Sequence, residues 1–133
     1  MNMIECIETR RSVRKYNDKK VSAETISKLI ELGTMAPTSM GKEPWGFVVL
    51  QDKEEINGWS EKIKTFLLNN MEQFSYLKQM EPILQKKDFS VFNHAENMIV
   101  IFGNTETHYY ATDCTLAAEN IMLAANSMGI GTC

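Results

Sequence analysis

Apolar residues recur at helical spacing in four stretches of the chain. The i, i+3, i+4, i+7 pattern, which marks one face of a helix, predicts helices over residues 3–10, from Ser22 to the residue before Pro37, over 52–69 and over 108–128. Ser22 is a favourable N-cap, and Gly129 fits the left-handed residue that often ends a helix. Gly33 lies on an apolar face and predicts close packing against another element. The last helix has so wide an apolar face that we expect it to be buried on most sides or to lie at a subunit interface.

Two compact apolar runs are typical of strands. Trp45–Leu50 predicts a buried strand and Met98–Phe102 a central strand. Residues 13–16 favour an extended exit from the first helix, whereas residues 70–94 lack a clean period and are compatible with a helical pair or a lid. Helices followed by strands separated by helices predict an α+β fold with few strands. Residues 129–133 resemble the turn into a further strand, so we expect 1–133 to be a single domain that lacks its C-terminal part.

Composition limits the possible function classes. The chain has 133 residues, 44% of them hydrophobic and 23% charged, as expected for one globular domain. A net charge of −3 gives no general attraction to nucleic acid or anionic membranes. The sequence has no apolar run of about 18 residues, which predicts no membrane span. The N-terminus lacks the charged and apolar regions of a signal peptide. The odd number of cysteines without a CxxC pair fits a reducing compartment, so we expect a cytoplasmic protein.

The cysteines and histidines predict no metal site. The count of three cysteines is odd and no CxxC pair occurs, which argues against both a disulfide framework and a zinc site. Cys6 and Cys114 have apolar neighbours, so we expect them to be small core residues. His94 and His108 have no second ligand at metal-binding spacing.

The most distinctive polar stretch is Arg10-Arg11-Ser12-Val13-Arg14. Guanidinium groups match phosphate oxygens bidentately, and a hydroxyl can bind between them. One interpretation is therefore a phosphate-bearing ligand. The alternative is a solvated basic face near the end of a helix, because basic runs usually lie on the surface.

Three stretches in register resemble the FMN-dependent nitroreductase family. They are Arg10–Arg14; the loop Ala36–Trp45, which is similar to the family's loop ending in Gln-Pro-Trp; and Asp113–Cys133 with its Gly-Ile-Gly-Thr-Cys end. The resemblance covers nearly the whole chain except about residues 70–94. It implies a nitroreductase-like α+β sandwich with a central antiparallel or mixed sheet flanked by helices. It also implies a homodimer with FMN at the interface.

The resemblance assigns roles to individual residues. Arg10 and Ser12 would bind the FMN phosphate, and Arg14 would face the N1–C2=O edge of the flavin, where a cation stabilises the reduced ring. For Arg11 two alternatives stay open: it could bind the phosphate or face solvent. Pro37, Thr38 and Ser39 would reach the flavin of the partner subunit. Gly41 is a further cofactor-binding candidate in this loop and stands where the family often has Asn. Glu43 stands where the family often has Gln. We expect Trp45 to be a core residue. We expect the side chains of Glu119 and Asn120 to bind neighbouring backbone groups.

The implied function is an FMN-dependent oxidoreductase. NAD(P)H would reduce the flavin, and a nitroaromatic, quinone or similar acceptor would reoxidise it in a ping-pong mechanism. Because the flavin carries the chemistry, no catalytic side chain is nominated. Two alternatives remain: a non-catalytic flavin-binding or interaction protein, and a relative with another flavin reaction such as reductive dehalogenation. We expect residues 70–94 to carry that difference; the sequence does not distinguish NADH from NADPH.

Overall fold

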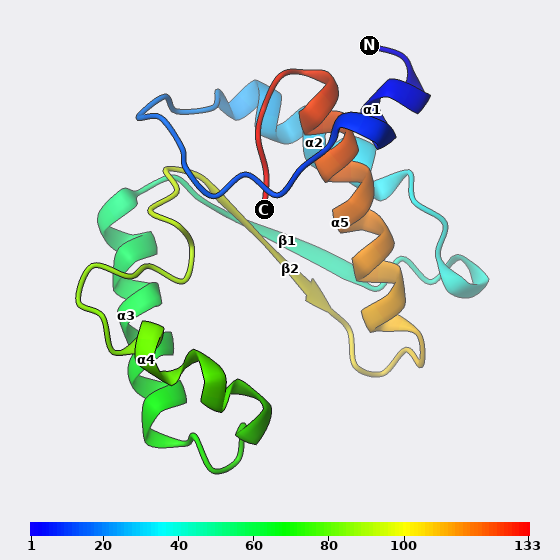
Figure 1. The fold of residues 1–133 in the computed structure, drawn as a ribbon. Coiled ribbons are helices and arrows are strands. Elements are labelled where there is room, and N and C mark those ends of the chain that lie inside the picture. Colours follow the sequence, from blue (N-terminus) through cyan, green and yellow to red (C-terminus); the bar gives the residue numbers. More distant parts are fainter. The chain divides into compact units, whose positions relative to one another are not determined.

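The computed structural model describes residues 1–133, which divide into two units (Figure 1). The first contains Met1–Arg14, Lys19–Val49 and Ile99–Cys133, and the second contains Lys15–Asp18 and Leu50–Met98. The predicted α+β class is confirmed, because helices accompany a small sheet. No helix combines the length and the apolar content that crossing a membrane requires.

The helices of the first unit follow the sequence prediction closely. They are α1 (Met3–Thr9), α2 (Ala23–Thr34) and α5 (Tyr110–Ser127). Asn2 and Glu5 form a capping box at the start of α1, and Ser22 Oγ accepts a hydrogen bond from Thr25 N (3.1 Å) at the start of α2. Gly129 has a φ of +73°, which confirms the left-handed end of the last helix.

Strands β1 (Trp45–Leu50) and β2 (Met98–Gly103) form a two-stranded sheet. The strands run in opposite directions (Figure 1), and Asn104 N, just after β2, donates to Pro44 O, just before β1 (2.7 Å). The prediction that β1 is buried was wrong, since Val48 is 45% exposed. The prediction that β2 is central was also wrong: it has one neighbour, and Phe102 is 58% exposed. Apolar runs identify strands, but burial of both faces requires neighbours that this sheet does not have.

One face of the sheet packs against α2 and α5. Leu29 of α2 and Ile121 and Ala125 of α5 form a buried cluster, against which Phe47, Ile99 and Ile101 of the strands pack. The expected close approach at Gly33 is confirmed, because an added Cβ would lie 2.7 Å from Ile121 Cγ1. The contact between α2 and α5 therefore depends on a residue without a side chain.

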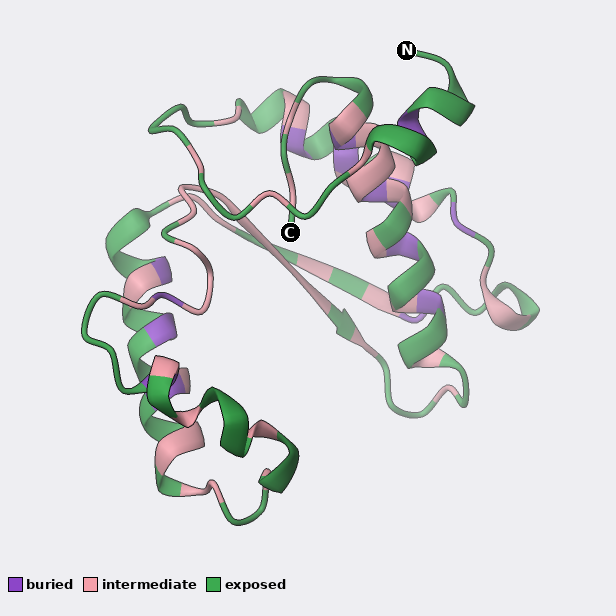
Figure 2. Cartoon of the chain, viewed as in Figure 1, coloured by how far each residue is buried: buried purple, intermediate pink, exposed green.

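The buried surface of α5 is a single stripe (Figure 2). The fully covered positions lie four residues apart; they are Asp113, Ala117, Ile121 and Ala125. Leu116 is 40% exposed, so the helix is not buried on most sides within one chain; the interface alternative stays a prediction. Cys6 is buried as expected, whereas Cys114 is only half-buried, because it lies beside the stripe.

The second unit is built on α3 (Lys53–Asn69), which Asp52 caps by accepting from Glu55 N (2.9 Å). Residues 70–94 do not form a regular helical pair. A 3-10 segment, Ser75–Met80, continues directly into the short helix α4 (Glu81–Leu84). Without an apolar period, this stretch has no continuous face to pack, and it stays in short turns.

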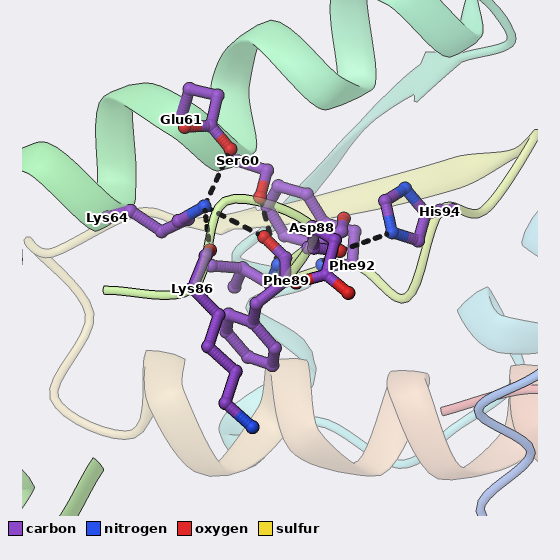
Figure 3. Close-up of polar contacts among 10 residues, drawn as sticks. Ser60, Glu61, Lys64, Lys86, Asp88, Phe89, Phe92 and His94 are labelled. Carbon is purple, nitrogen blue, oxygen red and sulfur yellow. Dashed lines mark hydrogen bonds and ion pairs between the residues drawn. The ribbon is translucent and has the colours of Figure 1, made fainter. Parts of the chain in front are cut away.

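Polar contacts fasten the end of this stretch to α3 (Figure 3). The buried Lys64 ammonium donates to Glu61 Oε1 (2.9 Å) and to the carbonyls of Lys86 (3.0 Å) and Phe89 (2.9 Å). One turn earlier, Ser60 Oγ accepts from Val91 N (2.9 Å). We call Ser60 and Lys64, with the backbone groups of residues 86–91 that they bind, the α3 clasp.

Candidate functional site

The basic segment Arg10–Arg14 begins where α1 ends. Asn126, in the last turn of α5, holds this helix end by donating from Nδ2 to Cys6 O (3.1 Å) and Thr9 Oγ1 (3.1 Å). After it, Ser12 and Thr132 form a parallel bridge, and Val13 N donates to Thr132 O (2.9 Å). These contacts hold Ser12 and Val13 in an extended conformation beside the last residues of the chain. The sequence predicted an extended exit over residues 13–16.

The three guanidinium groups have different surroundings. Arg11 Nη1 donates to Glu8 O (2.7 Å) and Arg10 O (2.8 Å), so its charge stabilises the carbonyl end of α1. Arg14 Nη1 has one long contact to Ser12 O (3.5 Å), and the Arg10 side chain has no hydrogen bond. None of the three forms an ion pair with a carboxylate. Arg10 and Arg14 therefore retain nearly all of their donors for an anion.

The second group of candidate residues, Pro37–Ser39, lies at the other end of α5. Ser39 N donates to Asp113 Oδ2 (3.1 Å), and Asp113 is only 4% exposed. Asp113 is not among the site residues expected from the sequence. One sequence signal could have identified it. Asp113 is the single carboxylate in a series of positions four residues apart whose other members, Ala117, Ile121 and Ala125, are apolar.

A pocket of about 330 Å³ lies between this loop and the start of α5. Its lining combines hydroxyl groups with apolar and aromatic surface; the residues are Pro37, Thr38, Ser39, Tyr109, Thr112, Asp113 and Leu116. The first three were predicted, whereas those from α5 were missed because helix periodicity does not show which residues face a cavity. The volume is near the lower limit of roughly 300–1,000 Å³ for small-molecule sites.

Several polar groups of the loop already have partners within the loop. Thr38 O accepts from Gly41 N (3.2 Å), Ser39 O accepts from Lys42 N (3.1 Å), and Thr38 Oγ1 accepts from Glu43 N (3.3 Å). The Ser39 hydroxyl and the Thr38 N–H have no such partner and remain for a ligand. Gly41, a predicted cofactor residue, does not line the pocket. Its φ of +62° lies in the left-handed region, as do those of Met40 (+52°) and Glu43 (+47°) in the same loop.

The structure does not bring the two predicted groups together within one chain. Asn126 holds the start of the basic segment and Asp113 holds the loop, and these anchors lie about 20 Å apart along α5 at 1.5 Å per residue. No hydrogen bond connects the groups. A single chain therefore presents a cationic segment and an amphipathic pocket as separate features.

Neighbouring residues of α5 have structural contacts. Asn120 Nδ2 donates to Leu32 O (3.3 Å), which confirms the expected backbone anchor. Burial, together with the Asp113 charge, raises the pKa of the Cys114 thiol, so this residue is protonated at neutral pH and is a poor nucleophile. No group of three or more metal-ligating side chains converges in the structure.

In sequence and fold, the chain is similar to known nitroreductases and to a flavin reductase. A putative NADH dehydrogenase/NAD(P)H nitroreductase of Archaeoglobus fulgidus is 31% identical over 138 residues, which cover 98% of this chain and 66% of the relative. The FMN reductase (NADPH) of Bacillus subtilis is 27% identical, over 99% of this chain and 53% of the relative. The crystal structure of a Bacteroides fragilis nitroreductase with bound FMN superposes with a TM-score of 0.87 at 27% identity, over 98% of this chain and 67% of that one.

The chain thus spans about two thirds or less of the length of these proteins. The Nitroreductase family model matches residues 7–133 of this chain. This range includes the basic segment from Arg10, the Pro37–Ser39 loop and the whole of α5. The chain belongs to the nitroreductase family.

Proposed function

We propose that this protein is an NAD(P)H-dependent FMN oxidoreductase that reduces nitroaromatic, quinone or similar acceptors by a ping-pong mechanism. The observation that carries the proposal is the superposition of nearly the whole chain on a nitroreductase with bound FMN. When bound, FMN supplies the two-electron redox chemistry; the protein supplies binding, orientation and electrostatics.

The chemistry of the two candidate groups fits FMN. Arg10 and Arg14 form no carboxylate ion pair and flank Ser12 in the sequence, and these residue types suit a phosphate and the polar edge of a flavin ring. The pocket offers the Tyr109, Leu116 and Pro37 surfaces with a few hydroxyl groups, which suits a planar aromatic ring. Arg10 and Ser12 would hold the phosphate, and Arg14 would place a cation near the ring.

The separation of the two groups supports a homodimer with FMN at its interface. In a twofold dimer the same surface of each subunit contacts the other, so a loop from one copy can complete a site on its partner. The basic segment of one copy and the Pro37–Ser39 loop of the other would then form each site. Exposed apolar residues at the N-terminus, including Ile4 (63% exposed) and Ile7 (56%), are available for such an interface.

Cofactor uptake tests the proposal directly. Purified protein is expected to be yellow, and denaturation should release FMN, identified by its absorbance and mass. Titration of flavin-free protein with FMN should quench flavin fluorescence with saturation. A colourless protein that does not take up added FMN would reject the proposal for this chain.

Rapid mixing separates an enzyme from a flavin-binding protein without turnover. The FMN-loaded protein is mixed anaerobically with NADH or NADPH, and then with a quinone or a nitroaromatic compound. Loss of the oxidised flavin absorbance in the first step and its return in the second are expected from a ping-pong enzyme. Bound flavin that neither nucleotide reduces would support the non-catalytic alternative.

A further inference from the structure

Asp113 is a buried carboxylate whose one partner outside its own helix is the pocket loop. It is 4% exposed and accepts from Ser39 N, which lies 74 residues earlier in the chain (3.1 Å). The other members of its stripe are apolar. Because a buried carboxylate is costly without a hydrogen-bond partner, the bond to Ser39 satisfies the carboxylate and fixes the loop at the same time.

The loop has few other means of holding its position. Pro37 has no N–H, and the short 3-10 turn Ser39–Gly41 is closed by hydrogen bonds within residues 38–43. The bond from Ser39 N to Asp113 is the only hydrogen bond that connects residues 37–43 to another element. It also lies in the wall of the pocket, since Ser39 and Asp113 both line it.

We propose that Asp113 is a positioning residue that fixes the Pro37–Ser39 loop so that the Ser39 hydroxyl and the Thr38 N–H face the bound cofactor. This rests on the proposed FMN function, because the loop is the cofactor contact. In this role Asp113 needs no contact of its own with the reacting atoms. It acts through Ser39 by removing the freedom of a loop that would otherwise have to be ordered when the ligand binds.

Three variants of the full chain test this role. Asp113→Ala removes the acceptor. Asp113→Asn keeps an oxygen that can accept the same N–H as a weaker, neutral bond. Asn120→Ala is the matched control, because it removes another side chain-to-backbone anchor from α5, the bond to Leu32 O, outside the pocket lining. Circular dichroism first establishes a temperature at which all variants are folded.

Two measurements follow at that temperature. Hydrogen exchange of the Ser39 amide, measured without flavin, should accelerate about tenfold or more in Asp113→Ala, less in Asp113→Asn, and not in Asn120→Ala. The Kd for FMN should rise in the same order, by about tenfold for Asp113→Ala. The exchange measurement does not depend on flavin, so it judges the anchor even where wild-type protein binds no FMN and the proposed function itself fails.

Unchanged Ser39 exchange in Asp113→Ala would overturn the proposal. An equal loss of FMN affinity in Asp113→Ala and Asn120→Ala would also overturn the proposal, because general destabilisation would then explain the effect. Recovery of affinity in Asp113→Asn, at a stability similar to that of Asp113→Ala, would support positioning specifically.

Discussion

At the scale of single residues, neighbouring arginines in the basic segment have different partners. Arg11 donates to two carbonyls at the end of α1, whereas the Arg10 side chain has no hydrogen bond or ion pair. A cation that already binds carbonyl groups has fewer donors to offer a phosphate. The structure therefore separates two residues that are equivalent in the sequence.

Arg10→Ala is expected to weaken FMN binding by about 1.5–3 kcal/mol, the value of a charge-assisted hydrogen bond, without lowering the free energy of unfolding appreciably. Fluorescence titration and urea denaturation measure the two quantities. Arg11→Ala is the matched comparison; it should lower stability by about 0.3–1 kcal/mol through the helix end and affect FMN less. Equal FMN affinity in Arg10→Ala and wild type would contradict the assignment.

Two helical glycines offer a second comparison. A Cβ at Gly33 would lie 2.7 Å from Ile121 Cγ1 and 2.9 Å from Cδ1, whereas a Cβ at Gly58 in α3 would meet nothing within 4 Å. Gly33→Ala should therefore destabilise the protein by about 1–3 kcal/mol through overpacking, despite the better helix propensity of alanine.

Gly58→Ala is the control and should stabilise the protein by up to about 1 kcal/mol, because alanine loses less conformational entropy in a helix. Urea denaturation of both variants provides the comparison. A Gly33→Ala protein as stable as Gly58→Ala would show that α2 and α5 are not packed as closely as the structure indicates.

At the scale of elements, the α3 clasp replaces the apolar face that residues 70–94 lack. Lys64 is nearly fully buried, and its ammonium donates to two backbone carbonyls and one carboxylate. The three N–H donors of the ammonium thus have three acceptors. The segment that ends at Val91 is thus fixed to α3 by polar contacts of two side chains, Lys64 and Ser60.

Lys64→Met keeps most of the aliphatic stem but leaves the carbonyls of Lys86 and Phe89 without their donor. We expect the free energy of unfolding to fall by about 2–6 kcal/mol, at roughly 1–3 kcal/mol for each of the two carbonyls left unpaired. Hydrogen exchange of the Val91 amide should accelerate as well. Lys86→Met is the control, because its exposed side chain is not part of the clasp; similar losses in both variants would argue against the clasp.

At the scale of the whole molecule, we propose that the site is formed by two copies of the chain. Each chain has its own basic segment and pocket loop at opposite ends of α5, so a twofold dimer would combine the segment of one copy with the loop of the other. This arrangement can be distinguished from a site formed within a single chain, because only shared sites can be restored by mixing defective chains.

The test mixes Arg10→Ala protein with a loop variant that has Thr38→Val and Ser39→Ala together. Each parent should bind FMN weakly. After unfolding and joint refolding, mixed dimers contain one site with both parts intact, and about a quarter of all sites should recover under random association. FMN fluorescence quenching and sedimentation give binding and size. No recovery in dimers shown to be mixed would indicate that each site lies within one chain.

Much of the fold followed from local chemistry. The helix ends at Ser22 and Gly129 and the bounds of β1 were predictable because caps, left-handed residues and apolar periods act within a few residues. The close packing at Gly33 was predictable for a similar reason, since a glycine on an apolar face leaves room for a neighbour. Residues 70–94 were not predictable, because the buried Lys64 holds their end through backbone groups that have no sequence signature.

The sequence by itself determined four of the helices (α1, α2, α3 and α5), the two strands, the basic segment and the resemblance of three stretches to a flavoprotein family. Only the tertiary structure decided which residues meet: that Asp113 holds Ser39, that Arg11 stabilises the end of α1, and that the loop and the basic segment lie at different ends of α5. The physical reason is the separation along the chain over which each interaction acts. Caps and periodicity depend on neighbours in the chain, whereas a hydrogen bond across 74 residues depends on how the elements pack.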